Sequence, residues 1–441
     1  SSDLVLLPKP GKPPGDPSSY RPICLLDTLG KLLERIILNR LTKYTESEHG
    51  LAARQFGFRK GRSTVDAIRK VVEKADEARR KKRRGNRCCA IVTIDVKNAF
   101  NSASWAAIAA ALHKMKVPDY LCMILKSYFE NRVLVYDTAD GQKTVVVTAG
   151  VPQGSILGSA LWNGMYDGVL TLGLPNGVEI VGFADDIVLT VTGENVEEVE
   201  VLAMEAIAMI ENWMLEVKLR IAHHKTEMVL VSNHKKVQQA QIQVGEHVVH
   251  SKRALKYLGV MVNDRLNFNS HVDYACEKAA KAIMALSRMM PNNAGPRSSR
   301  RRLLASVATS ILRYGGPVWW TALGTKRNRA LLDRTQRLMA MRVASAYRTI
   351  SSEAVGVIAG MIPIGITLEE DTVRYTRRGT RGIREAARAE SLARWQREWD
   401  TTEKGRWTHR LIPSVSTWVS RRHGEVTFHL TQFLSGHGCF R

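Results

Sequence analysis

The stretch EIVGFADDIVLTVT, residues 179–192, decides the fold, because it places two adjacent acids between two apolar runs. Apolar runs of this length are typical of buried strands, so the stretch predicts a strand–turn–strand hairpin with Asp185 and Asp186 in its tight turn. Adjacent carboxylates repel each other, and buried charge is costly unless it is paired or bound to metal. A solvated turn is the ordinary interpretation of an Asp-Asp pair, but the apolar strands on both sides would bury this one. The stretch therefore predicts a buried acidic site on a hairpin.

A third acid follows another apolar run. The segment CCAIVTID, residues 88–95, is typical of a buried strand and ends in Asp95. Three carboxylates brought together suit two divalent cations about 3.5–4 Å apart, one activating an attacking hydroxyl and the other stabilising a leaving group. Hard oxygen ligands favour Mg²⁺, with Mn²⁺ as an alternative. The predicted metal-binding set is Asp95, Val96, Asp185 and Asp186.

The rest of the chain divides into a mixed part and a helical part. An extended, irregular arm is expected over residues 3–22, a hairpin over 132–149 with Asp140-Gly141 as its turn, and an all-helical pattern from His271 onward. The expected helices are 25–41, 64–79, 104–115, a helix after 151–154 that reaches about 168, 196–216, 299–314, 326–346 and the Arg-dense 374–410. Further strands are expected at 226–232, 242–250 and 256–262. This order of elements predicts an α+β fold.

Length and charge limit what the chain does. Its 441 residues predict two or three lobes, and a hydrophobic content of 44% is normal for a protein with a core. Lys and Arg outnumber Asp and Glu by 65 to 42, which gives a net charge of +23. Such an excess favours a polyanionic partner, because basic surfaces displace counterions from phosphate backbones.

The six cysteines form no CxxC pair and no evenly spaced framework, which is typical of a reduced, intracellular protein. We find no signal peptide and no apolar run long enough to span a bilayer, so no membrane partner is expected. Both ends look cut, which predicts a fragment of a longer polyprotein. The terminal segment around Cys439 resembles the lead-in to a zinc knuckle, but its other ligands are missing and no zinc site can be built.

Seven motifs in order resemble those of reverse transcriptases. The hairpin motif FADD, residues 183–186, is similar to the metal-binding hairpin of non-LTR (LINE-type) retrotransposon and group II intron enzymes rather than retroviral ones. The other six are YRPICLLDTLGKLLERIILNRL (20–41), QFGFRKGRSTVDAI (55–68), AIVTIDVKNAFNSASW (90–105), AGVPQGSILGSALWN (149–163), HHKTEMVLV (223–231) and YLGVMV (257–262). The segments 348–360 and 434–441 further resemble insect non-LTR elements of the rDNA- or telomere-inserting kind.

The resemblance implies a right-hand polymerase. Its expected parts are an N-terminal arm and fingers (1–88), a palm with an antiparallel sheet (89–265, with a fingers insertion at about 115–150), a helical thumb (266–360) and a basic nucleic-acid-binding segment (361–441). The implied reaction is transfer of a nucleotide from a dNTP to a DNA 3′-hydroxyl on an RNA template. In such an element the primer is nicked target DNA, so the expected working site is the nucleus after synthesis in the cytoplasm.

The resemblance also implies roles for single residues. Asp95, Asp185 and Asp186 would serve the metal ions, and Lys225 would protonate the leaving pyrophosphate as a general acid. The expected nucleotide-binding residues are Phe100, which would exclude a 2′-hydroxyl, together with Gln153, Gly154, Arg59, Lys60 and Arg62. The expected nucleic-acid contacts are Lys9, Lys12, Arg300, Arg301 and Arg302.

Simpler interpretations remain open for several of these residues. The basic loop around Arg59 and the basic run 79–84 would both serve as solvated surface, and Phe100 would serve as a core residue. Trp319 and Trp320 would stack on nucleic acid or, more in keeping with their surroundings, lie in the helical core. Asn101 and Ala222 depart from the family pattern, and Ala222 weakens the assignment of Lys225.

Two other identities remain open at this point. One is a group II intron or telomerase-type reverse transcriptase, against which the segment 348–360 argues. The other is a catalytically inactive RNA-binding remnant, against which the intact aspartates, Phe100 and Gln153 argue. An endonuclease is expected elsewhere in the parent polyprotein and not in this chain. Oligomeric state, target site and recognised RNA are not predicted.

Overall fold

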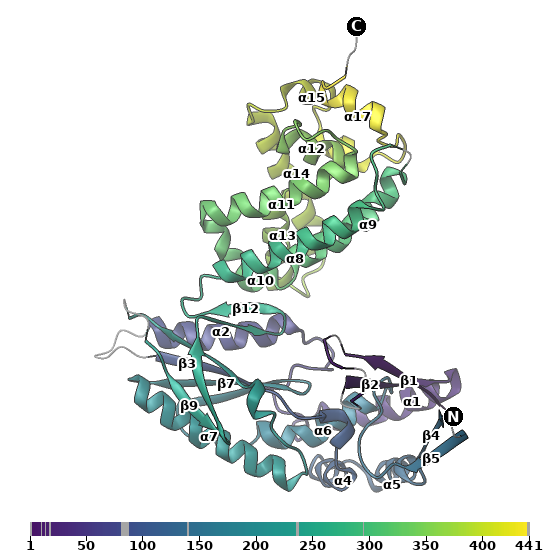
Figure 1. Ribbon diagram of the computed structural model, residues 1–441, viewed down its shortest axis with the longest axis vertical. Coiled ribbons are helices and arrows are strands. Elements are labelled where there is room, and N and C mark those ends of the chain that lie inside the picture. The colour runs from purple at the N-terminus through teal and green to yellow at the C-terminus, as the bar shows by residue number, and fades with distance from the viewer. Residues whose placement is uncertain are drawn as a thin grey trace. The chain divides into compact units, whose positions relative to one another are not determined.

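The computed structural model describes residues 2–9, 11–13, 15–16, 19–80, 88–138, 141–234, 238–293 and 295–438. The chain divides into two compact units, Ser1–Leu255 and Lys256–Arg441 (Figure 1). The first unit combines helices with a sheet, and the second is almost entirely helical. The expected α+β class is confirmed. The finer division into fingers, palm, thumb and C-terminal segment stays a prediction.

A six-stranded sheet forms the centre of the first unit, in the order β6-β7-β3-β8-β10-β9. Its strands are β3 (Cys88–Ile94), β6 (Val178–Phe183), β7 (Asp186–Gly193), β8 (Glu227–Ser232), β9 (Gln241–Val244) and β10 (His247–Lys252). Neighbouring strands pair antiparallel except β8 and β10, which pair parallel. The sheet therefore matches the expected antiparallel palm apart from one pair. The predicted single strand 242–250 is instead the hairpin of β9 and β10, reversed at Gly245.

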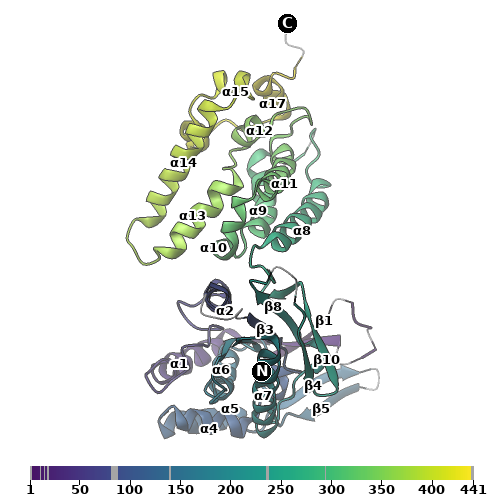
Figure 2. The same ribbon diagram turned by 90° about the vertical axis from the view of Figure 1, so that its left-hand side faces the viewer.

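Helices cover both faces of this sheet, which explains why β3 is apolar except at Thr93 (Figures 1 and 2). α2 (Thr64–Arg80) packs on one face, and α6 (Gly158–Leu170) and α7 (Val196–Glu216) pack on the other. Alternate residues of a strand point to opposite faces, so Cys88, Ala90 and Val92 join the core under α6 and α7. A strand buried on both faces needs a nearly continuous apolar run, which residues 88–92 and Ile94 supply.

The register of the sheet places the acids. Phe183 pairs with Asp186 at the closed end of the β6–β7 hairpin, and Ile94 pairs with Ile187 on the adjacent strand. Asp95 directly follows Ile94, and Asp186 directly precedes Ile187. The end of β3 and the β6–β7 turn therefore lie at the same edge of the sheet.

The remaining elements of the first unit are hairpins and helices. They are β1 (Ser2–Pro8), β2 (Tyr20–Leu26), α1 (Thr28–Thr45), α3 (Ala99–Ser102), α4 (Trp105–Lys114), α5 (Asp119–Phe129), β4 (Val133–Thr138), β5 (Gly141–Val146) and the 3₁₀ turn η2 (His223–Lys225). The expected irregular arm over 3–22 is wrong in part, because β1 and β2 pair along their full length. The hairpin over 132–149 is confirmed, although Asp140 lies outside the described residues.

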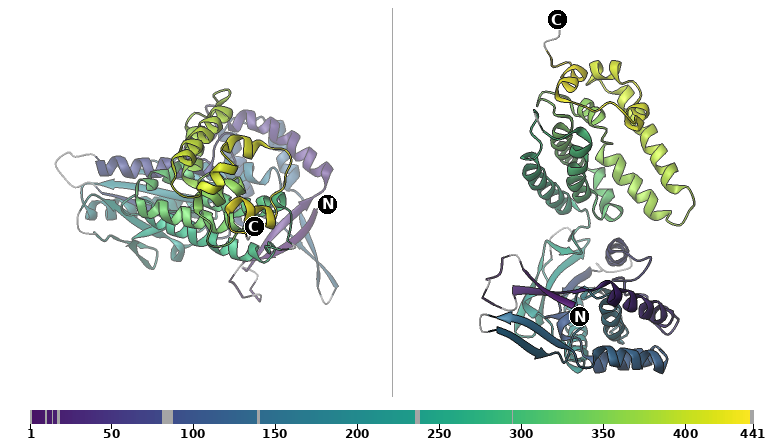
Figure 3. Two further views of the ribbon diagram at one scale, coloured as in Figure 1. Left: turned by 90° about the horizontal axis from the view of Figure 1, so that it is seen from above. Right: turned by 90° about the vertical axis from the view of Figure 1, so that its right-hand side faces the viewer.

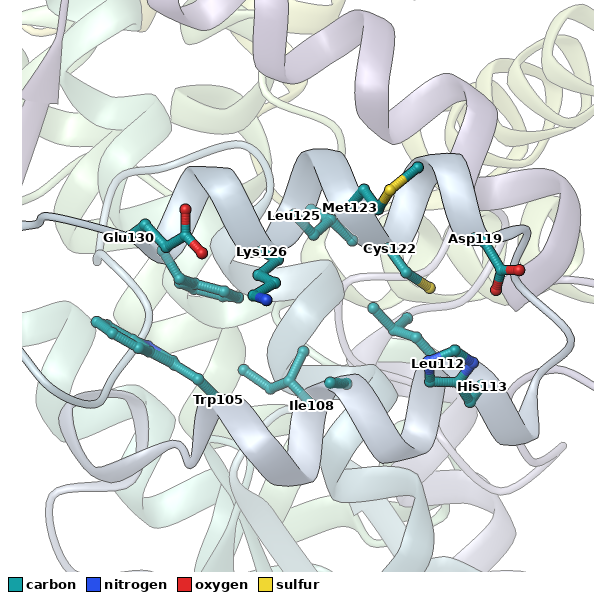
Figure 4. A pocket seen from close by; sticks show the side chains of 12 residues that line it. Trp105, Ile108, Leu112, His113, Asp119, Cys122, Met123, Leu125, Lys126 and Glu130 are labelled. Carbon is teal, nitrogen blue, oxygen red and sulfur yellow. The ribbon is translucent and has the colours of Figure 1, made fainter.

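α4 and α5 enclose an apolar cavity of about 550 Å³ (Figure 4). Trp105 and Phe129 stack at one end of it, with ring centroids 5.0 Å apart. None of the residues predicted for catalysis lines this cavity.

The strand β11 (Ala254–Tyr257) includes the last two residues of the first unit and continues into the second, where β12 (Val260–Asn263) and then helices follow (Figure 3). The helices are α8 (Asn269–Ser287), α9 (Ser298–Arg313), α10 (Gly316–Trp319), η3 (Trp320–Gly324), α11 (Lys326–Ala344), α12 (Ser352–Ala359), α13 (Ile364–Thr376), α14 (Ile383–Thr401), α15 (Arg406–Leu411), α16 (Val415–Ser420) and α17 (Phe428–Ser435). The all-helical pattern after His271 is confirmed. The predicted helix 374–410 is broken, since Gly379 and Gly382 adopt φ values of +91° and +75°.

Trp319 is fully buried and Trp320 is partly exposed, so the core interpretation holds for the first of the pair. The five cysteines in the described ranges are free, and Cys439 lies outside them. In the described part of the chain, no single helix is long and apolar enough to cross a membrane. The bent pair α12 and α13 meets that test together, by length and composition only.

Candidate active site

A cavity of about 1020 Å³ lies at the sheet edge that carries the aspartates. It is also bordered by β2 and η2. The predicted residues that line it are Lys9, Lys12, Asp95, Val96, Phe100, Gln153, Asp185, Asp186 and Lys225. The tertiary structure thus brings together predicted site residues from five separate segments of the sequence.

The turn that carries Asp185 is held by side chains from two other elements. Ala184 adopts φ +60°, a left-handed conformation that is unusual for a residue with a side chain. Its N–H donates to Gln55 Oε1 at 3.2 Å, and its carbonyl accepts from Trp162 Nε1 at 3.2 Å. Tyr166 donates its hydroxyl to the Asp185 carbonyl at 3.3 Å. These contacts fix the backbone of a turn whose side chains repel each other.

Close packing under the turn requires a glycine. A Cβ on Gly57 would lie 2.1 Å from the Ala184 nitrogen, which no real side chain tolerates. The Gly57 N–H donates to Gln55 Oε1 at 3.0 Å, and its carbonyl accepts from Asn163 Nδ2 at 2.8 Å. Gln55 is fully buried and serves both backbones. Sequence reasoning recognised this segment but gave Gln55 no role.

Burial and neighbouring negative charge disfavour the ionised forms of Asp185 and Asp186. Desolvation by the surrounding protein, together with the charges of Asp185 and Asp95, raises the pKa of Asp186 to about 6, although Asp186 keeps contact with solvent through the cavity. Burial first, and then the charge of Asp95, also raises the pKa of Asp185. A bound cation would relieve both effects, so the site favours cations or protons.

Asp95 already has a cationic partner. Lys225 Nζ lies 2.5 Å from Asp95 Oδ2. The segment before Lys225 is tied to the end of β3, because the Ala222 N–H donates to the Asp95 carbonyl at 2.8 Å and Val96 bridges to Ile221. The backbone pairing of residues 95–96 with 221–222 directs the Lys225 side chain toward the Asp95 carboxylate.

The donor set fits hard divalent cations, because three carboxylates and the backbone of Val96 line one cavity. Among the residues that the structure describes, however, no three His, Cys, Asp or Glu side chains form a ready-made metal site. Lys225 Nζ contacts one carboxylate oxygen of Asp95, Oδ2, and an ionised carboxylate has a second oxygen that accepts. A divalent ion at Asp95 would therefore share this carboxylate with Lys225 or displace it.

The loop that carries Gln153 rests on a buried acid, Glu34 of α1. Glu34 accepts hydrogen bonds from the Ser155 hydroxyl at 2.9 Å, from the Ile156 N–H at 2.6 Å and from the Tyr128 hydroxyl at 2.7 Å. Its residue is 3% exposed. Sequence reasoning missed Glu34, although an acid three and seven residues before the buried Ile37 and Leu41 is a signal that could have found it.

Backbone contacts complete the support of this loop. The Cys24 N–H donates to the Gln153 carbonyl at 2.7 Å. Gly154 adopts φ +102°, and a Cβ there would lie 2.5 Å from the Cys24 carbonyl oxygen. The lack of a side chain at Gly154 thus permits a close backbone approach to β2, and nucleotide binding by Gly154 stays a prediction.

Comparison with known proteins identifies the family. The model of the family described as "Reverse transcriptase (RNA-dependent DNA polymerase)" matches residues 7–262, which is more than half of the chain. The chain belongs to the reverse transcriptase family. Members of this family generally use divalent metal ions and act on nucleic-acid templates.

The relatives of this reverse transcriptase chain are proteins of retrotransposable elements. It is 29% identical to the Pol polyprotein of the type-1 element R1 from Bradysia coprophila and to the putative 115 kDa protein of element R1DM from Drosophila melanogaster, over 99% of its own length. It is 31% identical over 62% of its length to the RNA-directed DNA polymerase of mobile element jockey from Drosophila funebris, of which it covers 30%. The chain spans 45% and 44% of the two R1 proteins. The predicted resemblance to non-LTR retrotransposon proteins is confirmed.

Solved structures of telomerase are more distant. The telomerase of Candida albicans gives a TM-score of 0.42 at 12% identity, over 88% of this chain and 65% of that one. The telomerase of Candida tropicalis gives 0.45 at 11% identity, over 88% and 64%.

Phe100 in this reverse transcriptase chain packs on the core while it lines the cavity. Its ring stacks on Trp162, with centroids 5.1 Å apart, and meets Phe58 edge-on at 6.1 Å. The core interpretation and the predicted role at the sugar are thus compatible.

The predicted phosphate-binding loop lies outside the cavity. Arg59 donates to both carboxylate oxygens of Glu46 and to the carbonyls of Ala52 and Gln55, which leaves its side chain 6% exposed. Arg62 donates to the Ala53 carbonyl and lies over the Phe56 ring. Both guanidinium groups support the loop in this conformation. Lys60 is exposed, and nucleotide binding by the three residues stays a prediction.

The structure corrects the expectation for Arg301. Arg301 is 3% exposed, and its guanidinium donates to the carbonyls of Met290, Pro291, Pro296 and Arg342. A guanidinium whose donors are used by buried carbonyls supports the fold and is not free to bind nucleic acid. Arg300 and Arg302, on either side of it, are exposed.

Proposed function

We propose that this chain is an RNA-directed DNA polymerase that adds nucleotides from dNTPs to a DNA 3′-hydroxyl on an RNA template. One observation carries the proposal. The register of β3 and β7 brings Asp95, Asp185 and Asp186 to one cavity, which Gln153 and Lys225 also line. Membership of the reverse transcriptase family supports the same activity.

In this proposal Asp95, Asp185 and Asp186, with the backbone of Val96, hold two divalent ions, Mg²⁺ or alternatively Mn²⁺. When bound, the ions activate the attacking hydroxyl and stabilise the leaving group. The O3′–P bond forms as the bond between the α- and β-phosphates breaks, and pyrophosphate leaves. Lys225, already directed at the acids, donates a proton to that pyrophosphate.

The other cavity residues select and orient the substrate. Gln153 contacts the incoming nucleotide and template strand. Its loop is supported by hydrogen bonds to Glu34 and to Cys24 of β2. Phe100 stands beside the sugar, where its ring excludes a 2′-hydroxyl. Lys9 and Lys12 line the same cavity and contact the template backbone.

The relatives extend the proposal to the whole protein. Because they are proteins of retrotransposable elements, we place the reaction at nicked target DNA in the nucleus, after synthesis in the cytoplasm. An endonuclease in the parent polyprotein would supply the nick.

Primer extension on an RNA template with dNTPs and Mg²⁺ tests the activity. We expect the wild-type chain to extend the primer and the double variant Asp185→Ala, Asp186→Ala to bind primer–template without extending it. Equal extension by both proteins would show that the active site lies elsewhere. Binding without extension by either protein would favour the alternative of an inactive RNA-binding remnant.

A further inference from the structure

The turn between α13 and α14 carries the sequence RYTRRGTRGIR, residues 374–384, which we name the basic turn. It contains five arginines and no acid. α13 and α14 lie side by side, and the basic turn projects from the helical unit (Figures 2 and 3). Such a density of one charge at a projecting turn destabilises the free protein through self-repulsion.

Acids close to the basic turn are already engaged. Asp371 accepts two hydrogen bonds from Arg313 of α9, at 2.7 and 2.8 Å. Glu370, 3% exposed, lies 3.4 Å from both Arg374 and Arg388. These ion pairs link α13 to α9 and α14. The negative charges of Asp371 and Glu370 are therefore not available to the arginines at the end of the α13–α14 hairpin.

The outer arginines have no such partner. Arg377, Arg381 and Arg384 are exposed, and within the described ranges none of them forms an ion pair with a carboxylate. Glu385 follows directly in the first turn of α14, so it offsets part of their charge. The remaining positive charge faces solvent.

The backbone of the basic turn is accessible to another molecule. Part of the turn, including Arg384 but not Arg377 or Arg381, lines a cavity of about 580 Å³ together with Asp371 and Glu385. A Cβ at Gly379 or Gly382 would meet nothing within 4 Å, so another molecule can approach the backbone closely at both. Arg378 lies over the Tyr375 ring, 5.1 Å from its centroid.

We propose that the basic turn is a second nucleic-acid contact, in which Arg377, Arg381 and Arg384 bind the phosphate backbone. The inference rests on the proposed function, since it gives the polymerase a grip on RNA or DNA separate from its active-site cavity. Guanidinium groups bind phosphate oxygens with paired, charge-assisted hydrogen bonds, and closely spaced arginines match successive phosphates. The backbone of a single RNA strand and that of duplex DNA offer the same chemistry.

The test compares two triple variants of the full chain. The first is Arg377→Gln, Arg381→Gln, Arg384→Gln. The matched control is Arg297→Gln, Arg327→Gln, Arg397→Gln, which removes the same charge from exposed arginines of the same unit that each pair with a carboxylate. Binding is measured by fluorescence anisotropy over a salt series, with single-stranded RNA, duplex DNA and polyglutamate as separate probes.

The inference predicts a selective effect on one or both nucleic acids. The basic-turn variant should bind at least about tenfold more weakly than wild type, and its slope of log affinity against log salt should fall by about 2 to 3, as expected for three lost phosphate contacts. The arm that responds, RNA or DNA, identifies the partner. Equal weakening by the control triple would show an effect of net charge alone and overturn the inference. Unchanged affinity and slope would overturn it too, as would an equal loss on polyglutamate.

Primer extension separates this inference from the proposed function. At saturating, pre-annealed primer–template, the basic-turn variant should extend at the wild-type rate. The double variant Asp185→Ala, Asp186→Ala should do the reverse and bind normally without extending. A fully inactive wild type that still showed the selective loss of binding would refute the polymerase and leave the basic turn intact.

Discussion

Lys225 and Asp95 form an ion pair across the candidate active site, with Nζ 2.5 Å from Oδ2. They stand far apart in sequence, and the pairing of residues 95–97 with 220–222 brings them together. The charge of Asp95 raises the pKa of Asp185 and Asp186, and the Lys225 ammonium acts in the opposite direction on both. A divalent ion that binds Asp95 must share this carboxylate with Lys225 or displace it.

Replacing Lys225 should have separate effects on the rate of the reaction and on the Mg²⁺ concentration that it needs. We expect Lys225→Gln to lower the rate of single-nucleotide incorporation at saturating Mg²⁺ by about 10²–10⁴-fold, the usual contribution of a general acid. The Mg²⁺ concentration for half-maximal rate should fall, because Asp95 loses its competing partner. Rapid-quench assays over a Mg²⁺ series measure both quantities. The matched control is Lys252→Gln, which removes a similarly exposed pair with Glu227 outside the cavity. An unchanged maximal rate would rule out proton donation by Lys225.

Stability without divalent ions should depend on pH through Asp186. Its folded-state pKa of about 6 is raised above the ordinary value of 3.8, so the folded protein binds this proton more tightly than the unfolded chain. That contribution to stability is complete below about 4 and is lost as pH rises through about 6. Because Asp186 keeps contact with solvent, we expect a small change in the melting temperature. Asp186→Asn should flatten the pH profile. A wild-type profile identical to that of the variant would contradict the assignment.

Mg²⁺ should stabilise the protein more above pH 6 than below it. Above about pH 6 the Asp186 carboxylate is charged and gains from a cation, whereas below it the proton already occupies the group. Thermal melts with and without Mg²⁺ on both sides of this pH measure the difference. Equal stabilisation at both pH values would place the ion away from Asp186.

Glu34 should position the Gln153 loop. We expect Glu34→Gln to raise the KM for dNTP more than it lowers kcat, because the amide offers one acceptor oxygen where the carboxylate offers two. Its NH₂ group would then face one of the donors that Glu34 now accepts from, the Tyr128 hydroxyl or the Ile156 N–H. The unmet buried donor should cost about 1–3 kcal/mol of stability. Steady-state kinetics and denaturant melts measure the two effects. Tyr128→Phe, which removes a single hydrogen bond to Glu34, should show a smaller shift of KM. A loss of stability with unchanged KM would make Glu34 purely structural.

Gly57 should tolerate no side chain. A Cβ would lie 2.1 Å from the Ala184 nitrogen, so Gly57→Ala must displace the turn that carries Asp185. We expect at least about a hundredfold loss in extension rate, since small misplacements of reacting groups have effects of that size. Gly173→Ala is the control, because a Cβ there meets nothing within 4 Å. Wild-type activity in Gly57→Ala would show that the turn is not held as described.

The sequence alone determined the class of fold and the candidate acids. Strand, helix and turn patterns are local, and they predicted the hairpin around Asp185, the strand before Asp95 and the helical second half. The motifs, in their order, predicted the family. Local patterns failed where a strand forms only because a second strand pairs with it, as in β1 and β2. They also failed where glycines interrupt a helix, as after Thr376.

Only the tertiary structure decided which side chains are buried and which groups they bond to. An arginine in a basic segment has the same local pattern whether it faces solvent, like Arg300, or carbonyls from distant loops, like Arg301. The helical spacing of Glu34 to Ile37 and Leu41 indicates that this acid lies on a buried face, but it does not show that the donors are residues more than 90 positions away. Burial and hydrogen bonding depend on contacts between residues remote in sequence, and these contacts exist only once the chain has folded.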